Sequence, residues 1–225
     1  MNRSSRFLKK YLVFFTLLIF LGACQAPHPE TAQASFFSQK NDKKISKKGF
    51  AVVELFTSEG CSSCPPADKL SGQIVRKAAE QMEEVYVLAY HVDYWNYLGW
   101  KDQYSSPEYT KRQYWYARKF GSSRVYTPQM VVNGEVEFVG SRGSQAESQI
   151  SQALKSTRTR SQDLILSRDK GKIYYEIKGD LTGQSLRYAL VEKEASTQVR
   201  AGENRGAKLY HYNIVKDYGE ISTPK

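Results

Sequence analysis

The pattern of apolar and polar positions predicts alternating strands and helices in the central part of the chain. Apolar runs at residues 52–57 and 85–93 are typical of buried parallel strands, and the second is almost continuously apolar up to Tyr90. Between these runs, apolar residues four positions apart predict one buried face of a helix over residues 66–82, formed by Leu70, Ile74, Ala78 and Met82.

Two further helices are marked by their end residues and their periodicity. Ser106 followed by Pro107 is typical of a helix start, because serine caps the free N–H groups and proline fits the first helical position. This helix is expected to end near Phe120, and another is expected over residues 144–155.

A β-hairpin is predicted between these two helices. The pair Asn133–Gly134 favours a tight hairpin turn, and it lies between short strands expected at residues 129–132 and 135–139. The resulting order of elements is β-α-β-α-β-β-α, which predicts an α/β domain over residues 50–160.

The pattern changes after residue 162 to short strands separated by turn-forming residues. We interpret residues 161–225 as an antiparallel β meander that extends the α/β domain, and we predict no site chemistry there. The expected strands are residues 164–166, 173–177, 186–191 and 209–215.

A pair of cysteines, Cys61 and Cys64, lies between the first predicted strand and the first predicted helix. A Cys-x-x-Cys motif at this position is typical of a thioredoxin-like dithiol site, because the start of a helix favours a thiolate. The order of elements agrees with this interpretation. The sequence therefore predicts the α/β class and a thioredoxin-like fold with a C-terminal antiparallel β extension.

The N-terminal residues indicate export. A basic segment and an apolar segment precede Cys24, so we interpret residues 1–23 as a signal peptide. Residues 21–24 resemble a bacterial lipobox, in which the cysteine after the cleavage site carries lipid. Residues 24–49 then form a flexible tether, and the acyl chains hold the protein on a membrane in the bacterial cell envelope, facing the periplasm or the exterior. Alternatively, Cys24 lies near an ordinary cleavage site or remains a free thiol.

The two remaining cysteines support a redox mechanism. We expect Cys61 to be the exposed nucleophile at the helix start and Cys64 to be the more buried resolving thiol. The alternatives are a structural disulfide and a metal site. Two thiols and the distant His91 are too few for a structural zinc ion, so neither a metal nor another cofactor is predicted.

Three polar side chains near the predicted strands are candidate site residues. Glu54 lies in the strand that leads to the cysteines, where it is either a proton shuttle with a catalytic role or a partly solvated or paired acid. His91 and Asp93 end the second strand, where they bind substrate or act as a base. The alternative for His91 is a hydrogen-bonded side chain beneath the aromatic residues 94–100.

Thr127 and Pro128 precede the strand at residues 129–132, where thioredoxin-like proteins place a cis-proline. We predict a cis bond here, with the backbone of Thr127 facing the cysteines and binding an extended substrate. The alternative is a trans proline that starts the strand.

The chain has a formal net charge of +10, and residues 111–119 interleave basic and aromatic side chains. Such a stretch suits nucleic acid, but an exported protein rarely meets it. We interpret these residues as an amphipathic helix and predict no nucleic-acid partner.

Four further motifs stand out in the sequence, at residues 54–68, 91–96, 126–134 and 200–204. Together they resemble a bacterial secreted family known only as domain of unknown function twelve-twenty-three. The resemblance covers about residues 50–217 and implies a thioredoxin-like domain with a β extension, but no substrate.

These features predict an envelope thiol-disulfide oxidoreductase tethered by lipid, whose partners are protein or small-molecule thiols and disulfides and the membrane. The alternative is a binding lipoprotein on a thioredoxin scaffold, in which Cys61 and Cys64 form an inert disulfide.

Overall fold

The computed structural model describes residues 49–156, 163–179 and 185–221. The predicted signal peptide, Cys24 and nearly all of the tether lie outside the described residues. In chain order, the helices and strands are β1 (Ala51–Thr57), α1 (Pro65–Gln81), β2 (Val85–His91), the short 3-10 helix η1 (Asn96–Leu98), α2 (Pro107–Lys119), β3 (Gln129–Val132), β4 (Val136–Val139), α3 (Gly143–Lys155), β5 (Asp163–Asp169), β6 (Lys172–Lys178), β7 (Leu186–Gln198) and β8 (Lys208–Ile221).

The central sheet has the strand order β4-β3-β1-β2-β8-β7. Strands β1 and β2 are parallel, whereas β3 is antiparallel to β1 and β4 is antiparallel to β3. Together with α1, α2 and α3, these four strands form the predicted β-α-β-α-β-β-α order. The molecule therefore has a thioredoxin-like α/β fold, as the sequence predicts.

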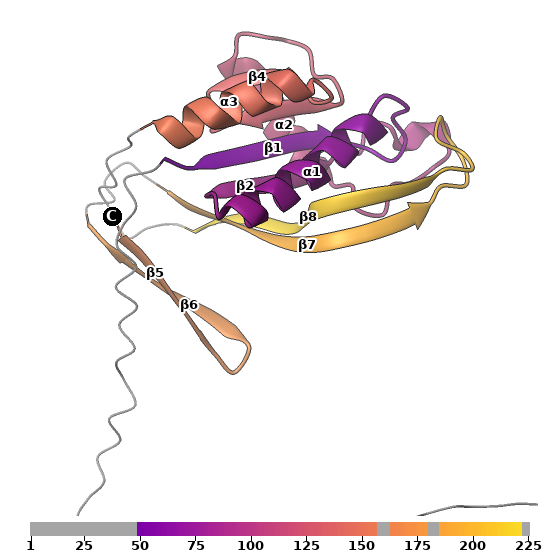
Figure 1. The fold of residues 1–225 in the computed structure, drawn as a ribbon. Helices are drawn as coiled ribbons and strands as arrows, with labels where there is room; N and C mark the ends of the chain where they lie inside the picture. Colours follow the sequence, from indigo (N-terminus) through magenta and orange to yellow (C-terminus); the bar gives the residue numbers. More distant parts are fainter. Residues whose placement is uncertain (1–48, 157–162, 180–184, 222–225) are drawn as a thin grey trace, which may run out of the picture. The chain divides into compact units, whose positions relative to one another are not determined.

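Helices cover both faces of the sheet, and Figure 1 shows α1 and α3 in front with the fainter α2 behind. Alternate residues of β1 supply the two cores because successive strand residues point to opposite faces. Val53 and Leu55 pack with α1 and α3, whereas Phe56 packs with Tyr109 and Tyr116 of α2.

Local signals place the element ends well. Ser106 caps α2 by accepting a hydrogen bond from the N–H of Glu108 at 3.2 Å, and Asn133 and Gly134 both have positive φ in the β3–β4 turn. One prediction for α1 is wrong: Met82 is not on its buried face. The helix ends at Gln81, and Met82 takes a left-handed conformation with 91% of its surface exposed.

The predicted single β meander at the C-terminus is also wrong. Strands β5 and β6 form a separate two-stranded sheet, whereas β7 and β8 join the central sheet, with β8 parallel to β2. Apolar burial explains the difference, since Ile214 and Val215 of β8 are buried while Leu166 and Ile173 of the β5–β6 hairpin are exposed. Turn residues predict hairpins but do not specify which sheet a hairpin joins.

Candidate redox site

A disulfide joins Cys61 and Cys64 in the segment between β1 and α1, with their Cα atoms 5.4 Å apart. The N–H of Cys64 donates to the carbonyl of Cys61 at 3.2 Å, and the N–H groups of Ala67 and Asp68 donate to the carbonyl of Cys64. Cys64 is the N-cap residue of α1 and two prolines follow it, so the disulfide closes a turn at the helix entrance. We call residues 58–64 the disulfide turn.

Both cysteines are fully buried, so the expectation that Cys61 is exposed is wrong. Ser62 and Ser63, which lie between them, are exposed. The disulfide turn packs closely against other segments: a Cβ atom added to Gly60 would lie 2.9 Å from Cβ of Trp95. The C-terminal strands also contribute, because Asn204 donates to the carbonyl of Cys61 at 2.9 Å.

The Thr127–Pro128 bond is cis, as predicted. Its segment lies beside the disulfide turn, since the hydroxyl of Ser63 donates to the carbonyl of Thr127 at 3.4 Å. The indole of Trp95 donates to the hydroxyl of Thr127 at 2.7 Å. The structure therefore brings Thr127 and Pro128 to the same site as the cysteines.

His91 lies beneath this site in a buried hydrogen bond. Its Nδ1 is 2.7 Å from Oδ2 of Asp102, and both side chains are essentially inaccessible. The Asp102 carboxylate also accepts from the N–H groups of Glu59 and Tyr104, each at 2.9 Å. Burial acts to raise the pKa of Asp102, but the charge and hydrogen bond of His91 and the two N–H groups hold it below its ordinary value.

Asp93 does not join His91 in this cluster. Its carboxylate accepts from the hydroxyl of Thr110 on α2 at 2.6 Å, and its N–H donates to the same hydroxyl at 3.2 Å. The two side chains predicted as one substrate-binding pair therefore make contacts in different places.

Three more buried ionisable side chains complete the cluster, namely Glu59, Asp68 and His211. Glu59 accepts from the indole of Trp100 at 2.7 Å, and its other oxygen is 3.3 Å from Nε2 of His211. The Glu59 oxygen and the His211 nitrogen are close enough for an ion pair but are not aligned as a hydrogen bond. We use the term buried acid–histidine cluster for Glu59, Asp68, His91, Asp102 and His211.

Within this cluster, the pKa of Asp68 is raised. Asp68 lies one helical turn after Cys64, is 4% exposed, and accepts from the hydroxyl of Thr57 at 3.2 Å. Burial raises its pKa from 3.8 to about 7, and the charge of His211 opposes this rise. A carboxyl group with this pKa exchanges its proton near neutral pH.

Glu54 lies on the opposite face of β1 from Val53 and Leu55 and makes its contacts with α2. Arg112 donates to both of its carboxylate oxygens, at 2.5 and 2.7 Å, and Tyr116 donates to one of them at 2.5 Å. Glu54 is thus the paired acid that the sequence left as an alternative to a proton shuttle.

Sequence reasoning missed Asp68, Asp102, Glu203, Asn204 and His211. The statement that the C-terminal strands carry no site chemistry is wrong, because Glu203 and Asn204 contact the disulfide turn and His211 lies beside Glu59. The sequence did contain a signal for three of these residues, since Asp68, Glu203 and Asn204 belong to the motifs of the family resemblance. Glu203, Asn204 and His211 have partners that are distant in the sequence, so local patterns did not reveal their roles.

A groove lies elsewhere, between α1 and α3. It has a volume of about 790 Å³, and Leu70, Ile74, Ala146 and Ile150 are among the residues that line it. It contains neither cysteine nor histidine, so the candidate chemistry is at the disulfide and not in this groove.

Within the described ranges, no three or more His, Cys, Asp or Glu side chains are arranged to hold a metal ion. No helix in the same ranges is long and apolar enough to cross a membrane.

The fold and the site define a protein with a thioredoxin-like α/β fold and a buried disulfide at the start of its first helix. Residues 52–225 match the family described as "Protein of unknown function (DUF1223)", and the chain belongs to this family. A crystal structure of a protein from Agrobacterium tumefaciens, determined as a structural genomics target, is similar to it with 32% sequence identity and a TM-score of 0.62. The similarity covers 76% of this chain and 72% of that protein. No curated protein matches the chain significantly.

Proposed function

We propose that this protein is a thiol-disulfide oxidoreductase of the bacterial cell envelope and a member of the thioredoxin-like superfamily. The observation that carries the proposal is the Cys61–Cys64 disulfide at the entrance of α1, beside the cis Thr127–Pro128 segment. The N-terminal sequence supports export and a lipid anchor on Cys24, since its basic and apolar segments are typical of a signal peptide and residues 21–24 resemble a lipobox.

The reaction exchanges one disulfide for another. In the reducing direction, the thiolate of Cys61 attacks a substrate disulfide, forms a bond to one substrate sulfur, and releases the other as a thiolate. The thiolate of Cys64 then attacks Sγ of Cys61, which releases the second substrate thiolate and leaves the protein disulfide. Two electrons pass from the protein to the substrate, and the oxidising direction is the reverse.

Positions around the disulfide support roles for other side chains. The carbonyl of Thr127 faces the disulfide turn, where it would accept a hydrogen bond from an extended substrate. Asp68, one turn from Cys64, would hold a proton for the resolving thiol, since its pKa is about 7. Glu54 is fully paired with Arg112 and Tyr116, so we assign it no proton transfer.

The test is capture of substrates as mixed disulfides. The full chain is expressed in a bacterium with its own N-terminus, either unchanged, as Cys64→Ser, or as Cys61→Ser. We expect Cys64→Ser to accumulate mixed disulfides that dithiothreitol releases, because the resolving thiol is absent. The Cys61→Ser variant is the matched control and should trap far less. Equal, negligible trapping by both variants would contradict the proposal.

The burial of both sulfur atoms favours a second candidate, a binding lipoprotein whose disulfide is structural. The reduction potential of the pair separates the two functions. Redox-active pairs have potentials between about −270 and −120 mV, whereas structural disulfides lie below about −300 mV. A potential below this limit, together with absent trapping, would support the binding protein.

A further inference from the structure

The loop at residues 199–207, which joins β7 and β8, reaches the disulfide turn from more than 130 residues away in the sequence. Its contacts to that turn come from Glu203 and Asn204 and are directed at backbone atoms. The mechanism above uses neither residue, although both belong to a motif that stands out in the sequence.

Asn204 uses both protons of its side-chain amide on the disulfide turn. Its Nδ2 donates to the carbonyl of Glu59 and to the carbonyl of Cys61, each at 2.9 Å. These two carbonyls lie on either side of Gly60, so the amide holds the backbone that leads directly into the disulfide. Loss of the side chain would leave two carbonyl groups without these donors.

Glu203 holds the next residue of the turn. Its Oε2 accepts from the N–H of Ser62 at 2.9 Å, and hydrogen bonds from the side chain and backbone of Ser62 hold the pKa of Glu203 below its ordinary value. Glu203 is therefore ionised at neutral pH. Its negative charge lies beside Ser62, the residue that follows Cys61, and there it disfavours a second negative charge on a Cys61 thiolate.

The 199–207 loop is closed by its own hydrogen bonds. The N–H of Gly206 donates to the carbonyl of Val199 at 2.9 Å, and the N–H of Val199 donates to the carbonyl of Ala207 at 3.0 Å. It also packs on the segment after η1, since a Cβ atom added to Gly202 would lie 3.6 Å from Cβ of Trp100. Glu203 and Asn204 thus act on the disulfide turn from a folded support.

We propose that Glu203 and Asn204 form a clamp on the oxidised disulfide turn, and that the clamp must release this turn before a thiol can reach Cys61. In the clamped turn Cys61 is fully buried although Ser62 and Ser63 are exposed, so a thiol reaches Cys61 only after the turn has moved. It favours the disulfide over the dithiol and protects the disulfide from small thiols that make no other contact with the protein. The inference concerns the site of the proposed function, but its test requires no substrate.

The test measures reduction of the disulfide by dithiothreitol. One thiolate of dithiothreitol attacks Sγ of Cys61, the Cys61–Cys64 bond breaks, and Cys64 leaves as a thiolate. The second thiol of dithiothreitol then closes a ring and releases Cys61, so two electrons pass to the protein and dithiothreitol becomes a cyclic disulfide. Timed alkylation of the free thiols gives the rate.

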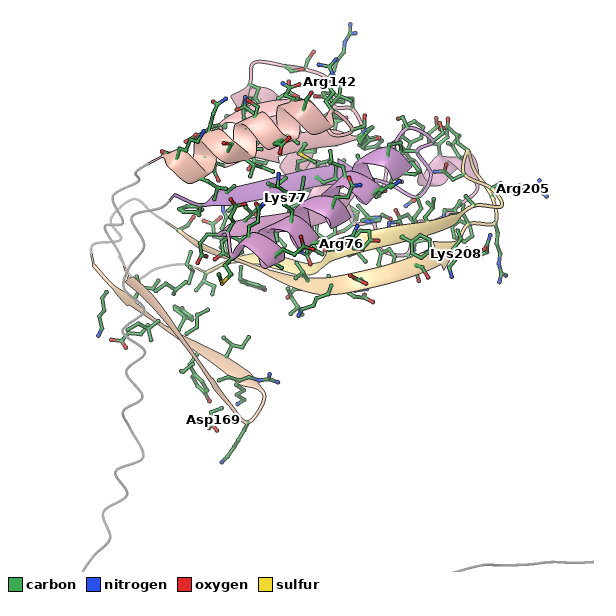
Figure 2. The ribbon with its side chains drawn as sticks, in the orientation of Figure 1. Arg76, Lys77, Arg142, Asp169, Arg205 and Lys208 are labelled. Carbon is green, nitrogen blue, oxygen red and sulfur yellow. A yellow bond between two sulfur atoms is a disulfide. The ribbon has the colours of Figure 1, made fainter. Side chains whose placement is uncertain are left out.

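The variants are Asn204→Ala, Glu203→Gln and the control Arg205→Gln. Arg205 is exposed and projects outward from the same loop in Figure 2. We expect Asn204→Ala to accelerate reduction about tenfold or more, as loss of two hydrogen bonds implies. The effect of Glu203→Gln should be about two- to threefold, because its charge is exposed and screened. Arg205→Gln should match the unchanged protein.

Equilibrium reduction potentials separate a clamp from a general loss of stability. If the clamp favours the disulfide, Asn204→Ala must also shift the dithiol–disulfide equilibrium toward the dithiol while the thermal melting of the reduced form stays unchanged. If Asn204→Ala does not fold, Asn204→Asp replaces it, since a carboxylate facing two carbonyl oxygens opens the clamp without loss of volume. Rates and potentials of both clamp variants equal to those of Arg205→Gln would overturn the clamp. A failure of the clamp test would leave the proposed function standing, since that function is tested separately by the trapping of substrates with Cys64→Ser.

Discussion

Two buried charged sites lie at β1, and they differ in how completely their polar groups are paired. The first joins Glu54 to Arg112 and Tyr116 under α2, and Arg112 also donates to Tyr218 at 2.8 Å. The second is the buried acid–histidine cluster beneath the disulfide turn. There, four side-chain atoms have no hydrogen-bond partner among the residues that the structure describes, namely Oε1 of Glu59, Nε2 of His91, and both ring nitrogens of His211.

This difference indicates a structural role for the first site and a chemical role for the second. At the first site every charge is matched, and the guanidinium also lies over the rings of Tyr90, Tyr116 and Tyr218 at 4.9 to 5.4 Å. Such a site holds α2 against β1. At the second site, several buried atoms make no hydrogen bond, and the raised pKa of Asp68 allows the charge of this side chain to change near neutral pH.

The largest expected effect comes from breaking the paired site. Arg112→Met leaves the Glu54 carboxylate buried without its counter-charge, which should lower the free energy of unfolding by about 3–5 kcal/mol. Urea denaturation measures this change. Adding Glu54→Gln to the variant should restore part of the loss, because no charge then remains unpaired. The exposed Lys111→Met on the same helix is the control, and a loss as small as that of the control would show that the pair is not structural.

At Asp68 we expect the free energy of unfolding to depend on pH. Its pKa is about 7 in the folded protein and 3.8 ordinarily, so the folded state loses this proton at a higher pH than the unfolded state does. The stability that the group contributes is complete below about pH 4 and is lost as the pH rises through about 7. Asp68→Asn removes this dependence. Relative to the unchanged protein, the variant should therefore gain roughly 4 kcal/mol between pH 4 and pH 8.

Urea denaturation at a series of pH values tests the Asp68 prediction. Glu80→Gln replaces an exposed acid on the same helix and is the matched control. Parallel stability curves for Asp68→Asn and the unchanged protein would contradict the raised pKa.

The smallest effect is expected at the His91–Asp102 pair of the buried acid–histidine cluster. Asp102→Asn keeps the shape of the side chain but removes the charge that faces His91, and it weakens the bonds from the N–H groups of Glu59 and Tyr104. We expect a loss of about 1–2 kcal/mol in the free energy of unfolding. A double-mutant cycle with His91→Phe should give a nonzero coupling energy, whereas additive effects would show that the two side chains do not depend on each other.

Local signals predicted much of the fold because their causes are local. Ser106 and Pro107 start α2 by capping geometry, and Asn133 and Gly134 adopt the positive φ values of a tight turn. The cis bond before Pro128 was also predicted, since its place before a strand and after a Cys-x-x-Cys motif is typical of the fold. The partner of Glu54 was not predicted, because Arg112 lies 58 residues away on helix α2.

The sequence by itself determined the α/β order, the position of the disulfide between β1 and α1, and the family to which the chain belongs. Only the tertiary structure decided that β8 lies beside β2, that Glu203 and Asn204 reach the disulfide turn, and that Cys61 is buried. The physical reason is the range of the interactions. Capping, turns and periodicity act over a few residues, whereas strand pairing and burial join residues that the sequence keeps far apart.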